Sequence, residues 1–191
     1  MQKLWLYTRQ YMLMANGDAP FDPRTPGLQC GRIWTGTSRV VYAMGPDPAT
    51  NSVTMTASFV FEVDDAASTQ NMQVLRVKSG SVNWEYILTD GGCTTRGGPQ
   101  AFTLLPQDGT ITLFLGDVET TFTAQGEMIR TDPVATYSTT CTDGRAYSTQ
   151  DAVGGTWLEV PEGTPAFPEG RGTMTGVITI GPFTSEWSFS R

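Results

Sequence analysis

Histidine is absent from this sequence of 191 residues, and its absence excludes several kinds of chemistry. Histidine is the usual general base of catalytic triads, so Ser–His–Asp and Cys–His catalysis within this chain are excluded. It is also the commonest protein ligand for metals, and three separated cysteines do not match the ligand spacing of zinc sites. We therefore expect no catalytic residues of these types, no metal and no cofactor.

Charged residues are also scarce, because they make up 16% of the chain against roughly 25% in an average globular protein. The twelve lysines and arginines are scattered singly, and the net charge is −7. A nucleic-acid-binding surface needs clustered basic residues, and anionic membranes repel a negative chain. No segment reaches the ~20 apolar residues of a transmembrane helix. We expect neither a nucleic-acid partner nor a transmembrane segment.

Only three cysteines are present, Cys30, Cys93 and Cys141. Cys93 and Cys141 lie beside Asp-Gly turn sequences, which predicts a disulfide between neighbouring strands or loops and leaves Cys30 as a free thiol or a bridge to another chain. The alternative is three reduced, buried cysteines in a cytosolic domain. A disulfide favours an extracellular or cell-envelope location, although residues 1–14 lack a convincing signal-peptide pattern.

The N-terminal residues 1–29 differ from the rest of the chain. Leu4, Tyr7, Tyr11 and Met14 recur at helical spacing, which predicts a short amphipathic helix, with an extended arm as the alternative. Three prolines then mark residues 18–29 as an extended linker. We expect this arm to dock on the β domain or on a neighbouring subunit, with contacts from its aromatic residues Trp5, Tyr7 and Tyr11.

From residue 30 to residue 191 the apolar residues recur with a period of two, which is the pattern of half-buried strands. The clearest case is residues 52–63, where apolar side chains alternate with Ser, Thr and Glu. Ser79-Gly80 predicts a hairpin turn, and so do the three Asp-Gly pairs at 90–91, 108–109 and 143–144. The expected strands are 31–44, 52–63, 73–77, 82–88, 101–105, 110–115, 120–125, 134–141, 153–160, 173–180 and 183–190.

About ten short strands without long helical patterns predict an all-β fold. We expect a single antiparallel β domain over 30–191, arranged as a β-barrel or a β-sandwich, and the sequence does not choose between the two.

Two stretches resemble a known family. Residues 30–37, CGRIWTGT, and residues 172–176, GTMTG, with the closing residues 187–191, are similar to the first and last strands of lipocalin-like (calycin-type) barrels of secreted bacterial proteins. The resemblance implies a barrel whose interior binds a small apolar ligand. It carries over no functional residue.

Paired carboxylates are the catalytic device that remains common without histidine. Glu85 lies between Trp84 and Tyr86, and a glycan hydrolase could use two carboxylates flanked by such aromatics; the candidates are Glu85, Glu119, Glu127, Glu159 and Glu186. The alternative, which no motif argues against, is that all of these face solvent. Asp64-Asp65, and Asp117 with Glu119, could hold calcium, although a solvated turn is favoured.

Most aromatic residues fall on apolar strand faces, where core packing is expected. Trp157 and Phe167 flank a proline-rich stretch at 161–172, and we expect these two to contact a ligand or partner, because loops on rigid β scaffolds carry function.

Three functions follow as hypotheses. The first is a non-catalytic, secreted or cell-envelope structural or interaction module that assembles with its own copies or with another envelope protein. The second is a lipocalin-like carrier of a small apolar ligand, and the third is a carboxylate-based glycan hydrolase.

Overall fold

The computed structural model describes residues 32–69, 71–115, 120–166 and 173–191. The predicted arm, with Trp5, Tyr7, Tyr11 and Cys30, lies outside these residues, as do Asp117, Glu119 and Phe167. The predicted all-β, antiparallel fold is confirmed. Its nine strands are β1 (Ile33–Ala43), β2 (Asn51–Val63), β3 (Met72–Asp90), β4 (Cys93–Thr103), β5 (Gly109–Leu115), β6 (Thr120–Cys141), β7 (Ala146–Pro165), β8 (Thr173–Ile180) and β9 (Phe183–Ser190). Among the described residues, no helix is long and apolar enough to cross a membrane.

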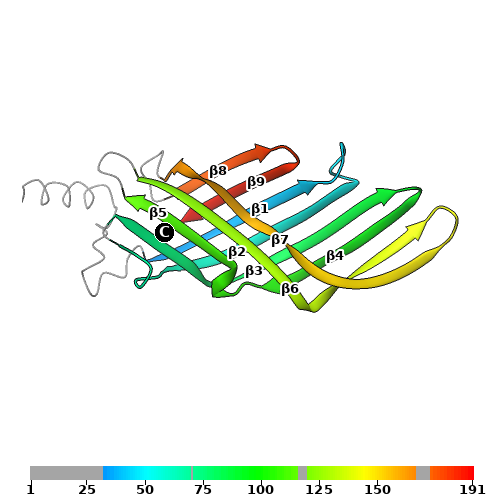
Figure 1. Cartoon of the computed structure of the whole chain (residues 1–191), viewed down its shortest axis with the longest axis horizontal. Coiled ribbons are helices and arrows are strands. Elements are labelled where there is room, and N and C mark those ends of the chain that lie inside the picture. Colours follow the sequence, from blue (N-terminus) through cyan, green and yellow to red (C-terminus); the bar gives the residue numbers. More distant parts are fainter. Residues whose placement is uncertain (1–31, 70, 116–119, 167–172) are drawn as a thin grey trace, which may run out of the picture.

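All nine strands belong to one sheet (Figure 1). Strands β8, β9, β1, β2 and β3 follow one another across it, and β6 with β7 lies on the far side of β3. Between β3 and β6, strands β5 and β4 lie end to end, each pairing with both neighbours. The short 3-10 turn η1 (Pro106–Asp108) fills the break between β4 and β5. All the pairings belong to one sheet, and contacts between β7 and the strands β1 and β9 show that this sheet is rolled.

The predicted hairpin at Ser79-Gly80 is wrong. Strand β3 runs through these residues for 19 residues without a turn, and a register shift at Val60/Phe61 of β2 accommodates the extra residue. Gly80 instead lets the backbone of β3 lie close to that of β2, because a Cβ there would be 2.6 Å from the carbonyl oxygen of Ser58. Strand β6 is also longer than expected, because the predicted strands 120–125 and 134–141 form one continuous strand of 22 residues.

The Asp-Gly pairs divide into two kinds. Gly91 and Gly92 have φ of 55° and 78° in the two-residue loop between β3 and β4, and Gly144 has φ of 87°, so two predicted turns are confirmed. The turn expected at Asp108-Gly109 is wrong, because Gly109 is extended, with φ of −164°. Asp108 is buried at the end of η1.

Glycines opposite aromatic residues let the sheet roll tightly. Across the inner face, Gly36 lies between Phe59 of β2 and Phe189 of β9, and a Cβ on Gly36 would come within 2.8 Å of both rings. The large rings fill the space that the glycines leave. The core on this face contains six fully buried aromatic side chains: Trp34, Phe61, Trp84, Phe122, Trp157 and Phe189.

The roll brings β7 against the inner face of β1 and β9. The Ser38 hydroxyl of β1 donates to the carbonyl of Trp157 at 2.6 Å, and the backbone N–H of Glu159 donates to the Ser185 hydroxyl of β9 at 3.3 Å. Ser38 and Ser185 are buried. These hydroxyls satisfy backbone groups on the edge of β7 that faces away from β6.

Candidate functional site

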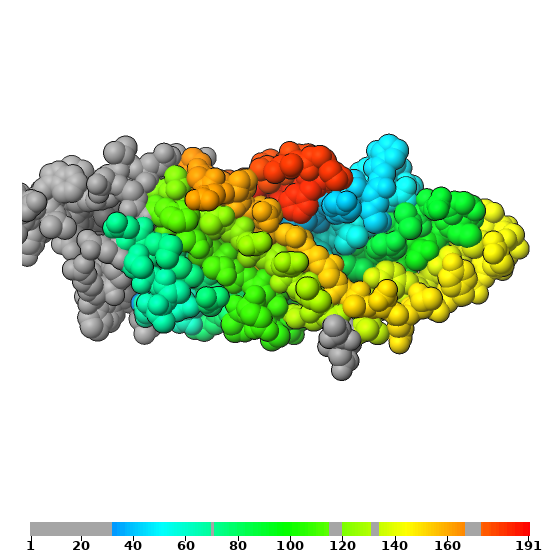
Figure 2. Space-filling model, in the orientation of Figure 1, coloured from blue at the N-terminus to red at the C-terminus, as the bar shows by residue number. Residues whose placement is uncertain are grey.

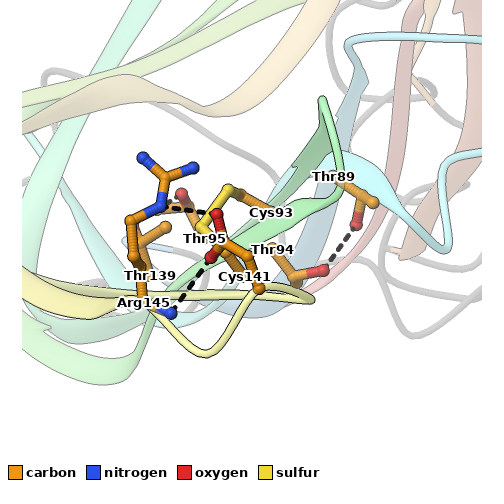
Figure 3. Close-up of a disulfide and its surroundings, with 8 residues drawn as sticks. Thr89, Cys93, Thr94, Thr95, Thr139, Cys141 and Arg145 are labelled. Carbon is orange, nitrogen blue, oxygen red and sulfur yellow. Dashed lines mark hydrogen bonds and ion pairs between the residues drawn. A yellow bond between two sulfur atoms is a disulfide. The ribbon is translucent and has the colours of Figure 1, made fainter.

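The predicted disulfide between Cys93 and Cys141 is confirmed. The two residues lie directly opposite each other on β4 and β6. Figure 3 shows them near two hydroxyl pairs: Thr95–Thr139, at 2.8 Å, joins the same two strands, and Thr89–Thr94, at 3.2 Å, joins β3 to β4. The bridge therefore ties together two strands that lie far apart in the sequence.

Trp157, which we expected beside a loop where it could contact a ligand or partner, lies within β7 and is packed in the core. Its side chain is completely buried, and its indole N–H donates to the backbone carbonyl of Asp108 at 3.1 Å. The ring lies over Gly109 and Gly126, where an added Cβ would come within 2.6 Å and 2.4 Å of ring atoms. The prediction failed because the proline-rich stretch after Trp157 continues β7 as far as Pro165 instead of starting a loop at residue 161.

No two of the described candidate glutamates lie directly opposite each other in the strand pairings. Glu85, Glu127, Glu159 and Glu186 lie on four strands, and across the ladders they face Thr54, Thr156, Gln125 and Arg39 respectively. Burial raises the pKa of the Glu159 carboxyl. Glycoside hydrolysis needs two carboxylates on opposite sides of the scissile bond, and the use of these glutamates in such a pair stays a prediction.

The turn at Asp64-Asp65 is held by arginines. Arg76 donates to Asp64 at 2.8 Å and Arg32 pairs with Asp65, and each hydrogen bond lowers the pKa of its carboxyl. Asp64 also accepts the backbone N–H groups of Ala66 and Ala67. These carboxylates are already engaged in a turn, and within the described ranges no group of three or more acidic or cysteine side chains is placed to hold a metal ion.

Two surface hollows open on the outer, hydroxyl-rich face of the sheet. The larger, about 510 Å³, is lined mainly by serines and threonines of β1, β2, β3 and β9. The smaller, about 290 Å³, includes Glu85 and Arg96 on its walls. Neither leads into the core, where the aromatic rings described above occupy the inner face. The lipocalin resemblance implies a ligand inside the barrel. That ligand stays a prediction, because neither hollow is an interior cavity.

Exposed apolar side chains occur at several places, among them Leu105, Ile129 and Tyr147, and two more lie at one end of the inner face. One transverse row of paired residues crosses five strands there, and we call it the apolar row: Ile180 (β8), Phe183 (β9), Tyr42 (β1), Val53 (β2) and Tyr86 (β3). Ile180 is 61% exposed and Tyr42 is 48% exposed, although both lie on the face that elsewhere forms the core. The rest of the row is half-buried.

Beyond Tyr86 the row meets further aromatic rings. Tyr86 packs edge-on against Tyr137 of β6 at a centroid distance of 5.2 Å, and both contact Trp84. The pKa of the Tyr137 hydroxyl is raised, mainly by burial and to a lesser extent by the charges of Asp151 and Tyr86. This end of the row is thus anchored on the core, whereas the Ile180 end reaches the margin of the sheet.

Val177 extends the exposed apolar surface onto the other face of β8. It is 64% exposed and stands among Thr173, Thr175 and Thr179 on the outer face. In Figure 2 the β8–β9 hairpin, in red, forms the middle part of the upper margin of this view. Sequence reasoning missed Val177, Ile180 and Tyr42, although a lone valine among threonines on a polar strand face was a usable signal.

Comparison with known proteins identifies no relative: no protein-family model, no curated protein and no solved structure matches this chain. The function is therefore argued from the chain itself.

Proposed function

We propose that this protein is a non-catalytic structural module that assembles with other copies of itself outside the cytosol. The observation that carries the proposal is the apolar row, which runs from the core to the margin of the sheet and ends on the exposed side chain of Ile180. A monomer would leave this surface in water, whereas contact with another subunit removes it from water and is favoured by the hydrophobic effect.

Charge favours a second copy as the occupant. Neither the apolar row nor any residue of β8 is charged, on a chain whose net charge is −7. Two copies therefore meet with least repulsion at this margin. A strongly basic or acidic partner would find no countercharge there.

Two further features support the proposal. The Cys93–Cys141 disulfide is typical of proteins in oxidising compartments, which agrees with a secreted or cell-envelope module. The lack of histidine supports a non-catalytic role. Contacts made by Trp5, Tyr7 and Tyr11 of the arm stay a prediction.

Sedimentation velocity of the full chain over a range of concentrations tests the proposal. We expect a dimer or larger species, and Ile180→Lys should shift the population towards monomer because it places a charge in the contact. Ile129→Lys is the matched control, since Ile129 is 68% exposed on β6 and lies outside the row. A wild-type chain that stays monomeric at every concentration would overturn self-assembly.

A further inference from the structure

The rolled sheet has two outermost strands, β7 and β8, and the contacts on their outer edges differ. On the edge of β7 that faces away from β6, the hydroxyls of Ser38 and Ser185 bond to the backbone of Trp157 and Glu159. Strand β8 pairs with β9 on one side, and no described strand pairs with its other side. Within the described part of the chain, β7 is thus partly covered on its outer edge, by β1 and β9, whereas no described strand pairs with the outer edge of β8.

The β8 edge also lacks the features that usually protect an exposed strand. Natural edge strands carry lysine, proline or a bulge, or they are covered by another segment. Strand β8, TMTGVITI, contains no charge and no proline, and its register with β9 is regular over all eight residues. Such an edge is a template for another strand.

We propose that β8 pairs antiparallel with β8 of a second copy, with Val177 opposite Val177 of the second copy on the two-fold axis. This inference rests on the self-assembly proposed above and names a strand and a register for it; of the apolar row, the pairing places Ile180 in the contact. The pairing joins the two rolled sheets into one continuous sheet with an isologous interface.

The side chains of β8 favour this register. Residues directly opposite each other must share a face of the sheet. One residue of β8 must therefore lie opposite the same residue of the second copy, with the two-fold axis midway between them. With Val177 on the axis, Ile178 faces Gly176 of the second copy and Ile180 faces Met174 of the second copy. Moving the axis to Gly176 leaves Ile180 opposite a residue beyond β8, and moving it to Ile178 does the same to Met174.

The backbone of the hairpin agrees with this register. Ile180 and Phe183 flank a two-residue loop, and the residues that flank such a loop form a hydrogen-bonded pair. Because the pattern alternates along the strand, Thr175, Val177 and Thr179 direct their N–H and C=O groups away from β9. These three residues form the hydrogen-bonded pairs of a dimer centred on Val177.

The charges nearest to the axis are compatible with the contact. Glu186 lies opposite Val177 on β9, and Arg39 of β1 lies opposite Glu186 on its other side. Each Glu186 is therefore flanked by an arginine of its own subunit, which reduces repulsion between the two copies.

Cross-linking tests the register. Val177→Cys in a Cys30→Ser background places one reactive thiol at the axis, because Cys93 and Cys141 are already bridged. We expect a short bis-maleimide reagent to convert the dimer to a covalent dimer. Ile129→Cys in the same background is the control, equally exposed and remote from β8, and should remain uncross-linked.

Thr175→Pro tests the backbone pairing separately. It removes an N–H that points away from β9 and leaves the β8–β9 ladder intact, so the subunit should still fold. We expect it to raise the dimer dissociation constant by about tenfold or more. A dimer that persists without cross-linking at Val177→Cys would overturn the β8 pairing while leaving self-assembly standing. A strictly monomeric wild type would overturn both.

Discussion

At the scale of single residues, Asp108 joins parts of the fold that are distant in sequence. Its carboxylate accepts the backbone N–H of Leu105 at 2.7 Å and pairs with Arg130 of β6 at 2.5 Å, and its carbonyl accepts the indole N–H of Trp157. The side chains of Asp108 and Arg130 are only 5% and 13% exposed. A buried charge whose partner is removed is costly, because it has lost both water and its counterion.

We expect Asp108→Asn to lower the free energy of unfolding by about 3–5 kcal/mol, since Arg130 would keep a buried charge without a countercharge. Urea unfolding measures the change. Asp143→Asn is the control, because Asp143 pairs with Arg145 at 2.7 Å on the surface, where such pairs contribute about 0–1 kcal/mol. Equal losses in the two variants would contradict the role assigned to Asp108.

At the scale of strands, glycines opposite aromatic rings decide how closely neighbouring segments approach. Gly126 of β6 lies beneath Trp157 of β7, and Gly176 of β8 lies beneath Trp187 of β9. Neither glycine has the positive φ that would itself require glycine. Their role is the space that they leave for a ring, and a methyl group would occupy it.

Gly126→Ala should therefore destabilise the protein by about 1–3 kcal/mol, because the new Cβ would lie 2.4 Å from a ring atom of Trp157. For a chain of this length each kcal/mol corresponds to a fall of roughly 2–4 °C in Tm, which a thermal melt detects. Gly154→Ala should leave Tm nearly unchanged, since the nearest atom to its Cβ is 3.6 Å away. A similar Tm for both variants would show that the ring does not set the spacing.

At the scale of the whole molecule, the disulfide fastens the part of the sheet that lies beyond the main core. It joins β4 to β6 across 48 residues of sequence. A cross-link of that span removes much of the freedom of the unfolded chain. It also ties stability to the redox state of the compartment.

Reduction of the disulfide should lower the stability by about 4 kcal/mol, the value that chain entropy gives for a loop of this length. Guanidinium unfolding with and without reductant measures the difference. Thiol titration of the denatured, unreduced protein should count one free cysteine, Cys30, of the three in the chain. Three free thiols would favour the cytosolic alternative over the exported module.

The candidate site was predictable only in part. The alternation in residues 173–180 and 183–190 predicted both strands of the β8–β9 hairpin with the bounds that the structure shows. The exposure of Ile180 and Tyr42 was not predictable, because both alternate with polar residues as core residues do. Whether an inward-facing side chain is covered depends on where β7 crosses the inner face, and no local pattern records that.

The sequence by itself determined the antiparallel strands, the turns at Gly91-Gly92 and Gly144, and the pair of cysteines that bridge, because each follows from local periodicity or local turn chemistry. Only the tertiary structure decided that β3 continues through Ser79-Gly80, that Trp157 is buried and that Asp108 pairs with Arg130. It also decided that β7 packs against β1 and β9, whereas β8 has no second described strand beside it. These features depend on which distant strands meet when the sheet rolls, and that is set by packing across the whole core.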